Sequence, residues 1–271
     1  MSLLKNEDHD GGLRRDLSLI LPRRHALGLL ASAAPAILLG GCAKGRADTA
    51  SLCVAASTET NGPFPADGSN SIDGARANLL IESGIVRSDI RPSLGSLTGT
   101  ADGVPVEMSI ALVDVNRSCA PLSGYAVYVW QCDANGEYSL YEIPDRNYLR
   151  GVGVGVTGAD GKVAFTTVFP GCYPGRYPHI HFEVYDNLAR ATSFANRRLV
   201  SQLALPEDAC AEVYGQAGLY RSNLAPFERT SIASDGVFND NSTAQMAAQT
   251  LKMAGSPQSG YAATCAVGIA V

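Results

Sequence analysis

The sequence predicts a mainly β protein: an antiparallel β-sandwich with an irregular N-terminal arm and few short helices. Two observations carry this prediction. Short runs rich in β-branched and aromatic residues recur from residue 104 onward, and glycine-rich turns separate them, whereas helix signals are sparse. With 271 residues, of which 46% are hydrophobic, the chain is long enough to bury one core of moderate size.

Six runs are expected to form strands. In the first, residues 104–115, apolar and polar residues alternate, so Val106, Met108, Ile110 and Leu112 share one face. The remaining runs span residues 124–132, 161–169, 178–186, 197–206 and 260–271.

Two segments carry helix signals. Residues 206–215 begin with Pro206, which suits the first position of a helix, and acidic residues follow in the first turn. Residues 242–255 are ambiguous, because their alanines favour a helix whereas their place between strands favours a strand.

The N-terminal residues 1–42 are typical of a bacterial export signal. The pair Arg23–Arg24 precedes a charge-free run, Ala26–Gly41, that is too short to span a bilayer. The twin arginine indicates the Tat route, which exports folded proteins. The residues LGGC look like a lipobox, which would make Cys42 the lipidated first residue of the mature protein. The alternative is an ordinary cleaved signal with an incidental cysteine.

We therefore expect an exported protein, located in the periplasm, outside the cell, or at the membrane as a lipoprotein. Residues 43–96 are expected to form a tether and an irregular arm, rich in Gly, Pro, Asn, Asp and Ser towards its end. Residues 97–271 are expected to form the sandwich domain. The formal net charge is −5, and the body of the chain has no Lys/Arg cluster, which argues against a nucleic-acid partner.

Six cysteines follow Cys42, and an even number in an exported protein indicates disulfides. Cys119 and Cys132 bracket an extended run and are not expected to pair with each other. Cys210 with Cys265 is one candidate pairing. The six are Cys53, Cys119, Cys132, Cys172, Cys210 and Cys265.

The chain has four histidines, and two of them lie in the predicted signal. The others, His179 and His181, stand in the predicted strand PHIHFEV, where side chains alternate between faces. Both imidazoles and Glu183 therefore share one face, and two imidazoles so placed can be ligands of one metal. A surface or hydrogen-bonded histidine pair is the alternative.

Tyrosines near this pair favour a ferric ion. Tyr173 lies in a tight loop, PGCYPGRYPH, that can fold it back over the histidines, with Arg176 close by. A cation beside a phenol favours the phenolate. Tyr138, which follows the turn DANG, is a second candidate. Two phenolates with two imidazoles suit Fe(III) better than Fe(II), and zinc sites commonly use other ligands.

The stretch from Ala120 to Val184, with the arm sequence ETNGPFP, resembles the intradiol ring-cleavage dioxygenases, the group that contains protocatechuate 3,4-dioxygenase and catechol 1,2-dioxygenase. The resemblance runs from about Thr58 to the C-terminus and is strongest to the exported bacterial branch. Its motifs are W-Q-x-D-x-x-G-x-Y, P-G-x-Y-P and R-x-P-H-I-H, in this order.

The resemblance implies a β-sandwich that binds non-haem Fe(III) and cleaves a small aromatic diol with O₂ to a muconate-type diacid, without an organic cofactor. It implies that Tyr173 leaves the iron to accept a substrate proton, and that Arg176 and Gln202 stabilise developing negative charge. The four implied iron ligands are Tyr138, Tyr173, His179 and His181.

Some positions depart from the best-known members of this group. Gly175 stands where those enzymes carry a tryptophan, and Ala204 where they carry a tyrosine. These positions shape the substrate pocket, so the resemblance does not imply which catechol is cleaved. Cys132 and Cys172 also differ, and either form disulfides that brace the ligand loops or remain two buried thiols.

Three other functions are compatible with parts of this pattern. One is an exported iron-binding module on the same fold that has lost turnover. Another is an Fe(II) or copper enzyme that uses His179, His181 and Glu183 as a facial triad. The third is a metal-free β-sandwich lipoprotein that binds carbohydrate or protein.

Overall fold

A computed structural model describes residues 53–153 and 159–271 of the chain. All of them belong to one compact unit, residues 46–271. The predicted export signal, residues 1–42 with Arg23, Arg24 and Cys42, lies outside the described residues, as does the start of the tether. Among the residues that are described, no helix has the length and apolar character needed to cross a membrane.

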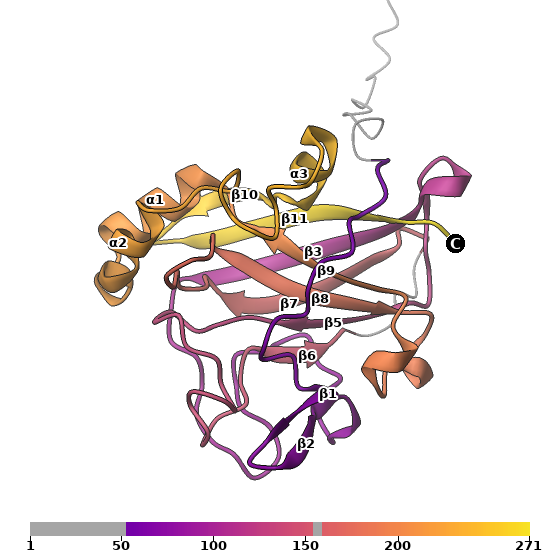
Figure 1. The fold of residues 1–271 in the computed structure, drawn as a ribbon, viewed down its shortest axis with the longest axis horizontal. Helices are drawn as coiled ribbons and strands as arrows, with labels where there is room; N and C mark the ends of the chain where they lie inside the picture. The colour runs from indigo at the N-terminus through magenta and orange to yellow at the C-terminus, as the bar shows by residue number, and fades with distance from the viewer. Residues whose placement is uncertain (1–52, 154–158) are drawn as a thin grey trace, which may run out of the picture. The chain divides into compact units, whose positions relative to one another are not determined.

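Two β-sheets and a separate hairpin make up the strand framework (Figure 1). The first sheet has the order β10-β11-β3-β4, and β7 also pairs with β3; its strands are β3 (Pro105–Asp114), β4 (Ala120–Pro121), β7 (Lys162–Val168), β10 (Lys252–Ser256) and β11 (Gly260–Ile269). The second sheet has the order β6-β5-β8-β9, with strands β5 (Ala126–Trp130), β6 (Arg150–Val152), β8 (His179–Tyr185) and β9 (Leu199–Ala204). The hairpin consists of β1 (Asp67–Ile72) and β2 (Ala75–Asn78).

The main core contains apolar side chains from both sheets. Val106, Met108, Ile110 and Leu112 are buried on one face of β3, as their alternation predicts. They belong to the same cluster as the apolar face of β8, with Ile180, Phe182 and Val184. The predicted β-sandwich is therefore confirmed, and each of the six predicted runs contains a strand.

One strand pair is parallel, which the sequence did not indicate. β11 pairs with β3 in parallel register from Tyr261↔Val106 to Ile269↔Asp114, while the other paired strands of the framework are antiparallel. A parallel pair needs a long connection between its strands. The chain between residues 115 and 259 forms this connection, and it includes the whole second sheet and the helices that follow it.

The helices are few and short, as predicted. Helix α1 (Glu207–Gln216) begins directly after Pro206 and has Glu207 and Asp208 in its first turn. The ambiguous run 242–255 contains both structures: α3 (Thr243–Gln249), which starts with a capping box between Ser242 and Gln245, and then β10. The other helical segments are α2 (Leu224–Phe227), η3 (Leu79–Ile81), η4 (Val115–Arg117), η5 (Leu188–Arg190), η6 (Phe194–Asn196) and η7 (Gly218–Asn223).

The second sheet is buried on both faces. Every residue of β5 and β8 is buried. On the face away from the main core, Trp130 and Tyr185 form a second apolar cluster with Ala66, Leu79 and Leu80 of the arm. The arm thus covers the sheet face that carries His179 and His181, and it separates this face from water.

The arm is more regular than its composition suggests. Strands β1 and β2 pair around Asp73 and Gly74, which have positive φ angles of 49° and 81°. Asp-Gly between short extended runs is a strong hairpin signal, because both turn positions require positive φ. The segment is rich in loop-forming residues, so its composition did not distinguish this Asp-Gly turn from its surroundings.

Arg150 joins the arm to the second sheet. Its side chain is fully buried, and its Nη1 donates to the carbonyl oxygen of Phe64 at 2.8 Å, while Nη2 donates to that of Ser139 at 3.2 Å. The Arg150 carbonyl in turn accepts a hydrogen bond from the Arg87 guanidinium at 2.7 Å. Arg150 therefore links the arm residue Phe64 to the loop that carries Tyr138.

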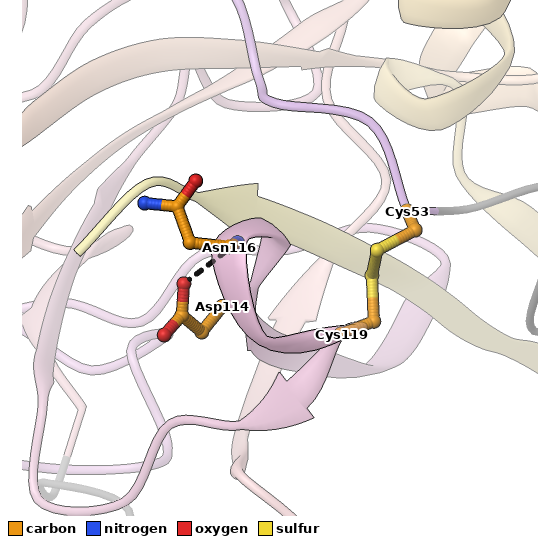
Figure 2. The surroundings of a disulfide bond; sticks show 4 residues. All are labelled: Cys53, Asp114, Asn116 and Cys119. Carbon is orange, nitrogen blue, oxygen red and sulfur yellow. Dashed lines mark hydrogen bonds between the residues drawn. A yellow bond between two sulfur atoms is a disulfide. The ribbon is translucent and has the colours of Figure 1, made fainter.

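A disulfide fixes the beginning of the described arm. Cys53 pairs with Cys119, and Figure 2 shows the bond beside η4, where the Asn116 N–H donates to Asp114 Oδ1 at 2.9 Å. Cys210 and Cys265 are both free. The candidate pairing of these two residues is therefore wrong, because Cys210 is buried in the main core on α1 while Cys265 is only partly buried on β11.

We expect Arg150→Ala to lower the free energy of unfolding by about 3 kcal/mol, because buried carbonyl oxygens lose their donor. Arg76→Ala, the same change at an exposed position of β2, serves as the control and should cost less than about 0.5 kcal/mol. Urea unfolding of both variants measures the difference. Equal stabilities would show that Arg150 does not tie the arm to the sheet.

Loss of the disulfide should also destabilise the protein. It closes a loop of 66 residues, so Cys53→Ala with Cys119→Ala should cost about 2–4 kcal/mol of unfolding free energy. Cys265→Ala, at a free and only partly buried cysteine, is the control and should cost about 1 kcal/mol or less. A double variant as stable as the control would contradict the expectation.

Candidate metal centre

The four predicted ligands converge on one place, although they come from three separate segments of the chain. Tyr138 Oη lies 3.1 Å from His181 Nε2, 3.5 Å from His179 Nε2 and 3.4 Å from Tyr173 Oη. Tyr173 Oη lies 3.1 Å from His179 Nε2, and the two histidine Nε2 atoms are 3.1 Å apart.

These spacings fit a single metal ion. When ligand bonds are about 2 Å long, neighbouring donor atoms around one ion are roughly 3 Å apart. The donor set of two phenol oxygens and two imidazole nitrogens also suits a hard, highly charged ion such as Fe(III), because each phenolate brings a negative charge. The residues present therefore fit the ferric ion that the sequence predicts.

The histidines present neutral nitrogens to this centre. Burial, and then the nearby Arg176 guanidinium, lowers the pKa of His179 to about 3. Burial and the neighbouring His179 lower the pKa of His181 well below its usual range. The Nδ1–H of His179 donates to the Tyr177 carbonyl at 2.6 Å, which leaves the Nε2 lone pair directed to the centre.

The tyrosines are harder to ionise than the sequence suggested. Burial raises the pKa of Tyr138 well above its ordinary value and that of Tyr173 to about 12. Arg176 does lower the pKa of Tyr173, as expected, but burial outweighs this effect. Ionised tyrosines at this place therefore require a further positive charge, such as a bound metal ion.

Close packing brings the two tyrosine loops together. The amides of Gly136 and Gly171 both donate to the Asp133 carbonyl, at 3.1 and 2.8 Å. A Cβ on Gly171 would lie 2.5 Å from the Gly136 nitrogen, so only glycine fits there. Buried Asn223 of η7 holds both loops: its Oδ1 accepts the Cys172 N–H at 2.7 Å, and its Nδ2 donates to the Ala134 carbonyl at 2.8 Å.

The ligand loops are not braced by disulfides. Of the two alternatives that the sequence left open for Cys132 and Cys172, the structure has the second, two buried free thiols. Burial raises the pKa of both, that of Cys172 to about 12, so neither is a thiolate. The Cys132 thiol is 3.5 Å from the Gly171 carbonyl, and the Cys172 thiol 3.7 Å from that of Arg176. The bracing comes from Asn223 and the backbone instead.

Arg176 lies at the centre, held by three partners. Its Nε donates to Asp235 Oδ2 at 2.9 Å, its Nη2 donates to Gln202 Oε1 at 2.6 Å, and its Nη1 is 3.3 Å from His179 Nε2. Asp235 is fully buried and also accepts the Tyr177 N–H at 2.6 Å. The guanidinium is thereby fixed in orientation beside the four converging side chains.

Gln202 also lies where the sequence predicts. It is opposite His181 in the register of β8 and β9, so both side chains share one face of the sheet. Its Nε2 donates to the Thr60 carbonyl of the arm at 2.8 Å. Gln202 therefore connects Arg176 to the arm that covers the site.

Glu183 takes no part in the centre. Its carboxylate accepts hydrogen bonds from Arg197 at 2.9 Å and from the Tyr185 hydroxyl at 2.5 Å. In residues 53–153 and 159–271, no three His, Cys, Asp or Glu side chains come together to hold a metal. This placement argues against a facial triad of Glu183 with the two histidines.

Asn223 and Asp235 were not predicted from the sequence. Each stands in a segment without a recognisable motif, between α1 and α3, and acts on residues more than 50 positions away. The only local signal is a polar residue surrounded by turn-forming neighbours, which is too common to indicate a site.

A cavity of about 320 Å³ opens onto the centre. The ring of Phe64, from the arm, lies 5.2 Å from the ring of Tyr138 and 4.8 Å from that of Tyr141. The volume can hold a small aromatic molecule. The cavity is lined by Pro63, Phe64, Gly136, Tyr138, Glu142, Tyr173 and Arg176.

The chain is similar to known dioxygenases in sequence and in fold. No family model matches the chain. The chain is 35% identical over 136 residues to the beta chain of protocatechuate 3,4-dioxygenase from Burkholderia cepacia. The match covers 44% of this chain and 55% of the relative, so the chain spans about half the length of the curated relative it matches.

A solved intradiol ring-cleavage dioxygenase from Tetranychus urticae matches the fold at a TM-score of 0.58, with 24% identity, over 80% of this chain and 95% of the other. The resemblance drawn from the motifs is thereby confirmed: in sequence the chain is similar to an intradiol ring-cleavage dioxygenase, and it has the fold of these enzymes.

Proposed function

We propose that the chain is a non-haem Fe(III) intradiol dioxygenase, which inserts both atoms of O₂ into a catechol-type aromatic diol and gives a muconate-type diacid. One observation carries this proposal: two phenol oxygens and two imidazole nitrogens, with five of their six pairs 3.1–3.5 Å apart, lie beside a cavity large enough for an aromatic ring. The similarity to dioxygenases supports it.

Four side chains would hold the ion. Tyr138 and Tyr173 would bind as phenolates, and His179 and His181 through Nε2. Ferric iron would orient the bound diol and withdraw electron density from it, which makes the ring reactive towards O₂.

The two tyrosines differ in exposure, and this difference indicates which of them would accept a proton from the diol. Both tyrosines lie on loops, but Tyr138 is 3% exposed whereas Tyr173 is only partly buried. The side chain of Tyr173 can therefore shift with less rearrangement, and Tyr173 would be the tyrosine that accepts a hydroxyl proton from the diol. With a pKa of about 12 when no metal ion is bound, Tyr173 would then hold that proton firmly.

Arg176 and Gln202 would stabilise negative charge that develops on the diol during attack by O₂. Both are pre-oriented, because Arg176 is fixed by Asp235 and Gln202 is fixed by the arm carbonyl of Thr60. Donors that are already in place need no reorganisation at the moment of reaction, which is why such groups are effective.

Export of the chain is part of the proposal. The disulfide between Cys53 and Cys119 supports an oxidising compartment, where such bonds persist. This agrees with the Tat-type signal and lipobox read in residues 1–42, and cell fractionation with detection of the processed N-terminus tests it.

The activity is tested by measuring O₂ uptake by the iron-loaded protein with catechol. The proposal predicts one O₂ consumed per ring, with both oxygen atoms of ¹⁸O₂ recovered in an acyclic diacid. Stable iron binding without O₂ uptake across several catechols would contradict turnover and leave an iron-binding module.

Tyr138→Phe should lower the bound iron at least about tenfold and remove most of the visible absorption that ferric iron gains from tyrosinate, because one anionic ligand is lost. Tyr141→Phe is the matched control. Its hydroxyl bonds the Ala66 N–H at 2.9 Å and Asn70, so it lies outside the donor set. Iron analysis and the visible spectrum compare the two, and equal iron and colour would remove Tyr138 from the ligand set.

Asp235→Asn should lower kcat with catechol about tenfold or more while iron content stays at the wild-type level. The reason is that Arg176 loses the charge that orients it, although the amide can still accept the backbone N–H of Tyr177. Asp240→Asn, at an exposed site in the same loop, is the control. Steady-state kinetics and iron analysis of both variants test this role of Asp235. An unchanged kcat, or a loss of bound iron in parallel with kcat, would contradict it.

A further inference from the structure

We propose that Glu142 makes this site select against catechols whose ring carries a negatively charged substituent. The inference rests on the proposed function, and it concerns the substrate class. Glu142 lines the same cavity as Tyr138, Tyr173 and Arg176, and of the residues that line it only Glu142 and Arg176 are charged.

Glu142 is held near the metal ligands by its own backbone and side chain. Its Oε2 accepts the backbone N–H of Tyr138 at 2.6 Å, and its own N–H donates to the Tyr138 carbonyl at 2.8 Å. Over the described part of the chain, no Lys, Arg or His forms an ion pair with this carboxylate. The exposed carboxylate of Glu142 therefore adds to the cavity wall a negative charge that no ion pair among the described residues balances.

Arg176 is not free to form an ion pair with a substituent on the ring. Its Nε already donates to the buried carboxylate of Asp235 at 2.9 Å. Its other nitrogens already face Gln202 at 2.6 Å and His179 at 3.3 Å. A carboxylate on the substrate ring would therefore find no free cation in the cavity, but would lie close to Glu142.

The expected consequence is electrostatic. Like charges at short range repel each other, and the water that reaches the exposed Glu142 weakens this repulsion without removing it. Neutral substituents experience no such repulsion, and ammonium groups are attracted. We expect an aromatic diol with a ring carboxylate to bind about tenfold more weakly than its neutral carboxamide, which has nearly the same shape.

The experiment measures binding rather than turnover. Ferric protein is titrated anaerobically with catechol, 3,4-dihydroxybenzoate and 3,4-dihydroxybenzamide, and the shift of the visible band gives each Kd. The same titrations are made with Glu142→Gln, which keeps the acceptor for the Tyr138 N–H. Glu137→Gln is the control, since Glu137 is exposed in the same loop and does not line the cavity.

In the wild type, the carboxamide should bind about tenfold more tightly than the carboxylate. This ratio should fall to about two or less in Glu142→Gln and stay at the wild-type value in Glu137→Gln. Equal Kd values for the carboxylate and the carboxamide in the wild type would overturn the inference, and so would a Kd ratio that Glu142→Gln leaves unchanged. If catechol still bound in either case, the proposed function would stand. Failure of all three ligands to shift the band would overturn the proposed function as well.

Discussion

Two phenol oxygens and two imidazole nitrogens meet in a buried position, with five of their six pairs 3.1–3.5 Å apart, and this convergence is the constraint on which the rest of the site depends. Burial keeps both imidazoles neutral and raises the pKa of both phenols, so that the group lacks negative charge until a cation is bound. A cation placed between these atoms gains two anionic ligands as the phenols ionise. In the proposed function, binding of the ion and the preference for a highly charged ion would therefore have the same cause.

Several contacts distant in sequence hold the four donors in place. The strand β8 sets the histidines two residues apart on one face, and the arm covers that face. Asn223 joins the two tyrosine loops, while Asp235 and Gln202 fix Arg176 beside the histidines. Because rigid elements and buried hydrogen bonds position the reacting groups, little reorganisation is needed when substrate binds. The mobility required by the proposed mechanism is confined to Tyr173, the more exposed of the two tyrosines.

Much of the fold, and the meeting of four predicted side chains at one place, could be predicted from sequence, because both depend on local patterns. Alternation in residues 104–115 indicates the buried face of β3, and the H-x-H spacing places His179 and His181 together. Long-range features were beyond these patterns: the parallel pairing of β11 with β3, the disulfide partner of Cys53, and the role of Asp235. The expected effect of Arg176 on Tyr173 had the right sign, but burial, which depends on the covering arm, turned out to be larger.

The central claim is that these four side chains bind Fe(III) with room for a diol beside it. The visible absorption spectrum of the ferric wild-type protein, recorded before and after anaerobic addition of catechol, tests it most directly. The account predicts a coloured protein whose band shifts to longer wavelength when catechol binds. A protein that remains colourless after reconstitution, with metal analysis showing no iron, would contradict it.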